Sequence, residues 1–169
     1  MWLLLIVTCE ALKIFFVPHS HIDVGWVRTV DDYYTMHAFP IISNILILLS
    51  EDPSRRFVWS EAIFLQRFLE ENPEKIPIFK QYLKEGRIEI VGGGWVMNDE
   101  ALVDFEGLIR QMTAGHNFFH KVLDVDHIKV AWQLDPFGHS SLTPAVFEKM
   151  GFEQMVMGRI SGVYRVRFI

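Results

Sequence analysis

Short runs of apolar, largely β-branched residues alternate along the chain with longer segments in which apolar residues recur at helical spacing. The runs span residues 14–18, 57–60, 88–91, 128–134 and 154–157, and each is typical of a buried parallel strand. Strands that alternate with helices predict right-handed crossovers and one parallel sheet, either open or closed into a barrel. The pattern therefore predicts a single α/β domain.

The longest helical segment begins near Phe105. Its apolar residues are spaced so that one stripe faces a sheet: Phe105, Leu108, Met112, Phe119 and Val122. Gly107 and Gly115 interrupt this segment and predict local weakness, because glycine disfavours a helix interior.

Two further helical segments carry start and stop signals. Ser60 is a candidate cap for a two-part helix that Pro73 interrupts and Gly86 ends. Thr143 is a candidate cap for a short helix with Gly151 just past its end. Both segments fit the alternation of strands and helices.

Composition narrows the class of protein. The 169 residues are 50% hydrophobic and 14% aromatic, which predicts a packed core. The net charge of −5, with no run of Lys or Arg, offers no electrostatic footprint for nucleic acid or an anionic membrane surface. The single cysteine, Cys9, excludes an intramolecular disulfide and leaves the redox compartment open.

Residues 1–11 resemble a secretory signal that lacks the usual basic start. The apolar stretch is far shorter than the roughly 20 residues that cross a bilayer, so no membrane span is expected there. Alternatively, residues 2–7 form a buried first strand. With a signal at 1–11, the α/β domain would occupy residues 12–169.

The first polar cluster is PHSHIDVGW, residues 18–26, directly after the first predicted strand. In an extended segment alternate side chains share one side, so His19, His21 and Asp23 face a common space. Imidazole with carboxylate suits zinc better than calcium, which prefers oxygen ligands. The alternative is that the histidines only cap the strand through hydrogen bonds.

The second cluster is WQLDPFGHS, residues 132–140, at the end of the fourth predicted strand. Pro136 restricts the preceding Asp135 to extended backbone conformations, which directs its carboxylate. Beside a divalent cation such a carboxylate stays ionised and can serve as ligand or nucleophile. Alternatively, Asp135 simply begins an Asp-Pro turn.

The third cluster is VGGGWVMNDEA, residues 91–101, after the third predicted strand. Its consecutive glycines permit close approach of a neighbour, and Trp95 offers a flat face on which a sugar ring can stack. The plainer interpretation is a glycine turn followed by a helix-capping Asp99. Because the carboxyl ends of parallel strands meet at one edge, all three clusters can share a pocket, with Trp26 and Trp95 as aromatic walls.

These segments resemble a known family, the class II α-mannosidases of glycoside hydrolase family 38. The resemblance rests on HSHIDVGW, GGGWVMNDEA, WQLDPFGHS and the later MGRI around Arg159, which occur in the family's order and approximate spacing. They cover nearly the whole chain. The first two segments incline toward the lysosomal type.

The resemblance implies a seven-stranded β/α barrel, of which this chain would supply about five strands. It implies that His21, Asp23 and Asp135 bind Zn²⁺, that Asp135 is also the nucleophile, and that His19 is not a ligand. It further implies that Trp26 lines the mannose subsite and that Arg159 lies close to the nucleophile.

The implied function is a retaining exo-α-mannosidase that hydrolyses terminal α-linked mannose from oligosaccharides or glycoproteins, in the lysosome, the vacuole or outside the cell. Family members are several times longer, and their general acid and fourth zinc ligand lie beyond the equivalent of Ile169. The partner expected for this fragment is therefore the missing carboxyl-terminal part of the enzyme, and the fragment alone is not expected to be active.

Two alternatives stay open at this point. The His/Asp cluster is also compatible with a zinc-dependent polysaccharide deacetylase, in which a metal-bound water attacks an amide or ester. The other alternative is an inactive, truncated family member that only binds glycan.

Overall fold

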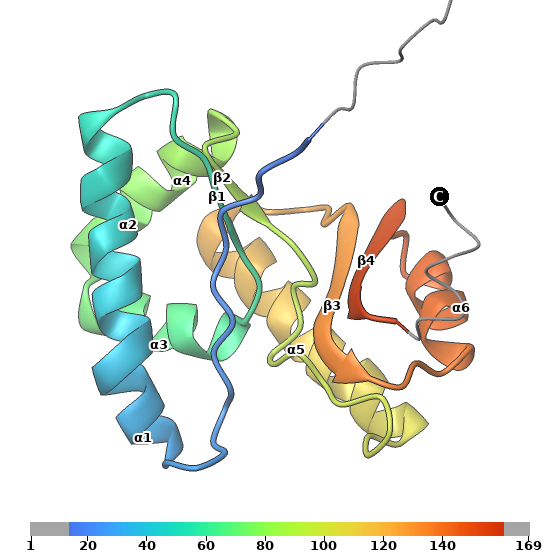
Figure 1. Ribbon diagram of the computed structural model, residues 1–169. Coiled ribbons are helices and arrows are strands. Elements are labelled where there is room, and N and C mark those ends of the chain that lie inside the picture. The colour runs from blue at the N-terminus through green and yellow to red at the C-terminus, as the bar shows by residue number, and fades with distance from the viewer. Residues whose placement is uncertain (1–13, 161–169) are drawn as a thin grey trace, which may run out of the picture.

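The computed structural model describes residues 14–160, as two pairs of strands among helices (Figure 1). The strands are β1 (Phe57–Trp59), β2 (Ile88–Ile90), β3 (Val130–Phe137) and β4 (Gln154–Arg159). The helical elements are α1 (Val30–Tyr33), η1 (Tyr34–Ala38), α2 (Phe39–Glu51), α3 (Ala62–Glu71), η2 (Pro73–Lys75), α4 (Ile76–Lys84), α5 (Phe105–Leu123) and α6 (Leu142–Lys149). The predicted leader, residues 1–11, lies outside the described residues.

Both strand pairs are parallel. In one pair Phe57 of β1 lies opposite Ile88 of β2, and in the other Val130 of β3 lies opposite Gln154 of β4. The Gly92 N–H donates to the Val130 carbonyl at 2.7 Å and links the two pairs. The predicted α/β class with parallel strands is confirmed. Within residues 14–160 the strands form two two-stranded sheets, so the closed seven-stranded barrel stays a prediction.

The predicted first strand, residues 14–18, is wrong as a strand. This segment runs in extended form beside β1 (Figure 1), but the described contacts are a single bridge between His19 and Val58 and a 3.0 Å hydrogen bond from the Val58 N–H to the Pro18 carbonyl. Phe15 and Phe16 are 82% and 89% exposed. A buried strand needs neighbours along its length, and here only the end of the segment has one.

Helical residues 30–51 form an element that the sequence analysis did not assign. Thr29 begins it with a capping box, because its hydroxyl accepts the Asp32 N–H while the Asp32 side chain accepts the Thr29 N–H. The helix then continues through η1 into α2, which buries Ile42 and Leu49 in the core. The resulting rod lies on one side of the molecule, beside α3 (Figure 1).

By length and composition, the helix Val30–Glu51 could cross a membrane. A core helix passes the same test, and a third of the apolar window is buried inside this fold. The expected absence of a membrane span therefore stays a prediction.

The helix predicted from Phe105 is confirmed as α5, which is continuous through both of its glycines. Asp104 caps it by accepting the Gly107 N–H at 2.6 Å. The predicted stripe is buried at Leu108, Met112 and Phe119, whereas Phe105 is 58% exposed at the helix start.

Two predicted caps are displaced. Glu61, not Ser60, holds the N-cap position of α3, and Ser141 precedes α6, so that Thr143 lies buried within that helix. Sequence patterns locate the ends of a helix only to within one or two residues, and the packing of the folded chain sets the final positions. Gly151 does follow α6, with a φ of +94°.

His116 on α5 gives the fold a predicted pH dependence. It is half-buried, its ring lies 5.7 Å from that of Phe152, and its Nε2 lies 3.4 Å from the Gly92 carbonyl. Burial lowers the pKa of His116, and nearby His127 lowers it further, although the Gly92 carbonyl opposes the change.

Because the folded-state pKa lies below the unfolded value, the unfolded chain binds the proton first as the pH falls. The stability that neutral His116 contributes should therefore be lost as the pH falls from about 6.5 toward the folded-state pKa. The urea midpoint of the unaltered chain, measured with chelator present, should fall more steeply over this window than that of His116→Gln. Parallel curves for the two proteins would contradict the assignment.

Candidate metal centre

His21, Asp23 and Asp135 converge at the carboxyl end of the strands. One ligand atom from each residue lies within 4.8 Å of the others. The His21 Nε2 is 3.3 Å from an Asp23 oxygen and 3.6 Å from the Asp135 Oδ2. Two segments more than a hundred positions apart in the sequence thus place an imidazole and two carboxylates around one point.

These distances fit a zinc ion. With bonds of about 2.0–2.1 Å in a tetrahedron, neighbouring ligand atoms lie roughly 3.3–3.4 Å apart. The two separations from the His21 Nε2 are close to that value. One imidazole nitrogen with two carboxylate oxygens is also a donor set that zinc accepts, with room left for a fourth ligand.

Local backbone explains how His21 and Asp23 come to share one side. The segment is tied to β1 at His19, and Ile22, which is 5% exposed, turns into the core between the two polar residues. The alternation predicted for extended backbone therefore holds from His21 to Asp23. Gly25, with a φ of +79°, then turns the chain.

His19 is not part of this group. Its ring packs edge-on against Trp132, with 5.5 Å between centroids, and its Nδ1 lies 3.4 Å from the Ser20 carbonyl. Sequence spacing alone could not tell which of the two histidines belongs to the metal centre. In the structure the His21 ring faces the two aspartates, whereas the His19 ring faces Trp132.

Arg159 lies against Asp135. Its Nη2 donates to the Asp135 Oδ1 at 2.8 Å, while the other oxygen, Oδ2, faces His21. The guanidinium also lies over the Phe137 ring, 5.1 Å from the centroid. The two carboxylate oxygens of Asp135 are therefore placed differently, one toward the candidate metal and one toward a fixed positive charge.

The two tryptophans predicted as aromatic walls lie differently. Trp26 is 78% exposed and lines a cavity of about 420 Å³ together with His21, Asp23 and Asp135. Trp95 is half-buried and packs against the hydrophobic core. A sugar can reach Trp26 in this arrangement, whereas sugar stacking on Trp95 stays a prediction that its core contact does not favour.

The residues after β2 supply the rest of the cavity wall. Gly92 and Gly93 have φ values of +65° and +71°, and the chain then runs past the site so that Asn98 and Asp99 line the cavity. The Asp99 Oδ1 accepts the Ala101 N–H at 2.9 Å, which is a local turn bond. The predicted helix cap at Asp99 is therefore wrong, because Asp104 caps the following helix and Asp99 only closes a local turn at the edge of the cavity.

Sequence reasoning missed Glu61. Its side chain is 1% exposed, and its Oε1 lies 3.8 Å from the His21 Nδ1, on the opposite side of the ring from the aspartates. Burial raises the pKa of Glu61 to about 7; the N–H groups of Glu61 and Ile22 oppose this rise, and the Asp23 charge adds to it. A charged residue directly after a buried strand is the signal that would have identified it.

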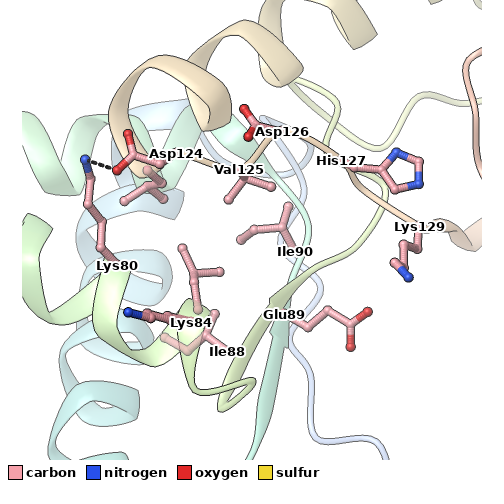
Figure 2. Close-up of a pocket in the computed structure, with 12 residues that line it drawn as sticks. Lys80, Lys84, Ile88, Glu89, Ile90, Asp124, Val125, Asp126, His127 and Lys129 are labelled. Atoms are coloured by element: carbon pink, nitrogen blue, oxygen red, sulfur yellow. Dashed lines mark ion pairs between the residues drawn. The ribbon is translucent and has the colours of Figure 1, made fainter.

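A second hollow lies at the other end of the strands, between β2 and the segment that leads into β3 (Figure 2). Several of its charged side chains are held in ion pairs, in part with Glu153, which lies outside the lining. Lys80 pairs with Asp124 at 2.7 Å, and both Lys129 and His127 lie within 4 Å of Glu153. Nothing in this hollow resembles the convergent polar groups of the candidate metal centre.

Comparisons with known proteins identify the family of the chain. The family model described as "Glycosyl hydrolases family 38 N-terminal domain" matches residues 11–164. Alpha-mannosidase C of Dictyostelium discoideum is 40% identical, over 94% of this chain and 14% of its own. Lysosomal alpha-mannosidase of Mus musculus is 38% identical, over 88% of this chain and 16% of its own. This chain therefore spans only about a seventh of such relatives.

A solved structure gives the same result. The crystal structure of an alpha-mannosidase from Enterococcus faecalis V583 superimposes with a TM-score of 0.73 and 25% identity, covering 83% of this chain and 16% of that one. The fold described above is thus the fold of one part of a much larger protein.

Proposed function

The chain belongs to glycosyl hydrolase family 38, whose amino-terminal domain it matches, and on this premise we propose that it carries the nucleophile and three zinc ligands of a retaining exo-α-mannosidase. The proposed substrates are oligosaccharides or glycoproteins that end in α-linked mannose. Since the chain covers a small part of its relatives, the proposed general acid and fourth zinc ligand belong to a longer polypeptide or a partner.

One observation carries the proposal: His21, Asp23 and Asp135 meet within 4.8 Å in a cavity that exposed Trp26 also lines. Carboxylates brought this close repel one another unless a cation or a proton lies between them. The arrangement therefore favours cation binding beside a surface on which a sugar can stack.

In the proposed mechanism, Asp135 attacks the anomeric carbon of the terminal mannose. The new carbon–oxygen bond forms as the glycosidic bond breaks, and the leaving oxygen takes a proton from the general acid. Water later hydrolyses the resulting ester between Asp135 and the mannose. Arg159, at 2.8 Å, holds the Asp135 carboxylate in place, and Trp26 supports the sugar ring. A bound zinc ion would hold substrate hydroxyls and favour distortion of the ring toward the transition state.

A direct test joins metal binding to covalent labelling. The 169-residue chain should bind Zn²⁺ in a calorimetric titration, and zinc should raise its melting temperature, since a ligand that binds only the folded form stabilises it. A fluorinated mannosyl donor with an activated leaving group needs no general acid, so it should label the chain even without one. Mass spectrometry should place the label on Asp135.

The label also separates this proposal from the deacetylase alternative. A deacetylase uses a metal-bound water and forms no sugar ester on Asp135. Zinc binding without labelling would contradict the glycosidase mechanism, and a chain that neither binds zinc nor becomes labelled would contradict the whole proposal.

The proposal extends to location. The proposed location is the secretory pathway, with the protein ending in the lysosome, in the vacuole or outside the cell. The similarity to a relative named lysosomal alpha-mannosidase supports this location. Fusion of residues 1–11 to a reporter enzyme tests this, because a secretory signal should direct the reporter out of the cytosol.

A further inference from the structure

The environment of Glu61 is unusual for a glutamate at the start of a helix. It holds the N-cap position of α3, yet its side chain makes no capping hydrogen bond. Instead, the first N–H groups of α3, on Ala62 and Ile63, donate to the carbonyls of Gly94 and Trp95 at 3.0 and 3.2 Å. Because the glycine-rich segment satisfies these donors, the Glu61 side chain is free to turn away from its own helix.

The Glu61 carboxylate turns inward and ends beside His21. Its side chain is 1% exposed, and neither of its oxygens makes a hydrogen bond of normal geometry within the described residues, although the N–H groups of Glu61 and Ile22 lie near enough to act on its charge. Its backbone is held by a 2.7 Å hydrogen bond from the Trp59 Nε1 to the Glu61 carbonyl. A buried carboxylate is costly without a partner, and the polar atom that it faces is the His21 Nδ1, 3.8 Å away.

The His21 ring therefore has two distinct sides. Its Nε2 faces Asp23 and Asp135, and its Nδ1 faces Glu61. A histidine that binds a metal through one ring nitrogen usually donates the N–H of the other to a carboxylate or carbonyl. Glu61 is not in the group of candidate ligands, so its place is behind the ligand rather than on the metal.

We propose that Glu61 is a positioning residue for the metal centre: its carboxylate accepts the Nδ1–H of His21, and this fixes the tautomer and ring orientation that present Nε2 to zinc. The inference rests on the proposed metal centre. The Glu61–His21 gap of 3.8 Å exceeds the 2.7–3.2 Å of a direct hydrogen bond, and it is expected to close when a metal holds Nε2.

The test compares the zinc affinity of variants by competition with a fluorescent chelator. Glu61→Leu keeps a side chain of similar size but removes the acceptor, and its zinc affinity should fall about 10- to 100-fold, as is typical when the outer partner of a metal-binding histidine is lost. Glu61→Gln keeps an oxygen that can accept the Nδ1–H, so it should retain most of the affinity.

Glu71→Gln is the control for general destabilisation. Glu71 accepts the hydroxyl hydrogen of the buried Tyr34 and pairs with Arg67, far along α3 from the metal centre. This variant should unfold more readily and yet bind zinc as the unaltered chain does. If Glu61 had a purely structural role, Glu61→Leu would likewise unfold more readily and bind zinc with unchanged affinity.

Ring-nitrogen NMR of the zinc-loaded, unaltered chain gives a second readout that does not depend on the folding of the Glu61 variants. The His21 signal, assigned through its loss in His21→Gln, should show a protonated Nδ1 and a zinc-bound Nε2. Zinc on Nδ1, or an unchanged zinc affinity in Glu61→Leu, would overturn the role of Glu61 and leave the proposed metal centre standing. A chain that binds no zinc at all would overturn both.

Discussion

Asp135→Asn should abolish covalent labelling by the activated mannosyl donor and weaken zinc binding by about 100-fold or more. The loss of affinity should exceed the roughly 10- to 100-fold that is typical when a residue that only supports a metal ligand is removed. One oxygen of Asp135 faces His21 and the other accepts a hydrogen bond from Arg159. An amide has no negative charge and a much poorer oxygen nucleophile, so both roles are lost together. Mass spectrometry and calorimetry on the same sample measure the two effects.

Two variants make this result specific. Asp126→Asn changes an exposed aspartate that pairs with His120 at 2.8 Å, away from the metal centre, and should leave labelling and zinc affinity unchanged. Asp23→Asn removes a ligand but not the nucleophile, so it should weaken zinc binding and still be labelled when zinc is saturating. Labelling of Asp135→Asn would show that another residue is the nucleophile.

The parts of the site that were predictable share one cause. In parallel strands the carboxyl ends meet at one edge, so a polar residue directly after a buried run can be placed without knowing the fold in detail. This reasoning joined His21 and Asp23 to Asp135 across more than a hundred positions, and the structure brings their ligand atoms within 4.8 Å. The alternation of apolar runs with segments of helical spacing separately predicted all four strands, β1 to β4, and the helix α5.

The parts that were not predictable depend on contacts that periodicity does not encode. Trp95 follows three glycines and looked free to stack on a sugar, but it packs against the core. Glu61 was not identified from the sequence, because nothing local shows that the carbonyls of Gly94 and Trp95 take over the capping of α3. Residues 14–18 have the composition of a strand, but pairing depends on neighbours that are not local.

Gly115→Ala should destabilise the chain by about 1–3 kcal/mol, although alanine is favoured over glycine in a helix interior by about 1 kcal/mol. A Cβ on Gly115 would lie 2.2 Å from the Gly93 carbonyl oxygen and 2.7 Å from the Trp95 nitrogen. Both are backbone atoms, and the Trp95 N–H donates to the Gln111 carbonyl at 3.0 Å, so the segment is tied to α5 where it would have to move. The glycine predicted to weaken α5 instead lets the segment beside the site approach it.

Urea unfolding of Gly115→Ala and Gly107→Ala measures the effect on one helix. At Gly107 the added Cβ would meet side-chain atoms of Val103 and of Asp104, whose Oδ1 accepts the Gly107 N–H. Weakening that cap costs about 1 kcal/mol and the helix preference of alanine offsets about as much, so this variant should stay within about 1 kcal/mol of the unaltered chain. Equal midpoints for the two variants would contradict the close approach at Gly115. A lower midpoint for Gly115→Ala alone is the result expected from the close approach of residues 93–95, beside the site, to α5.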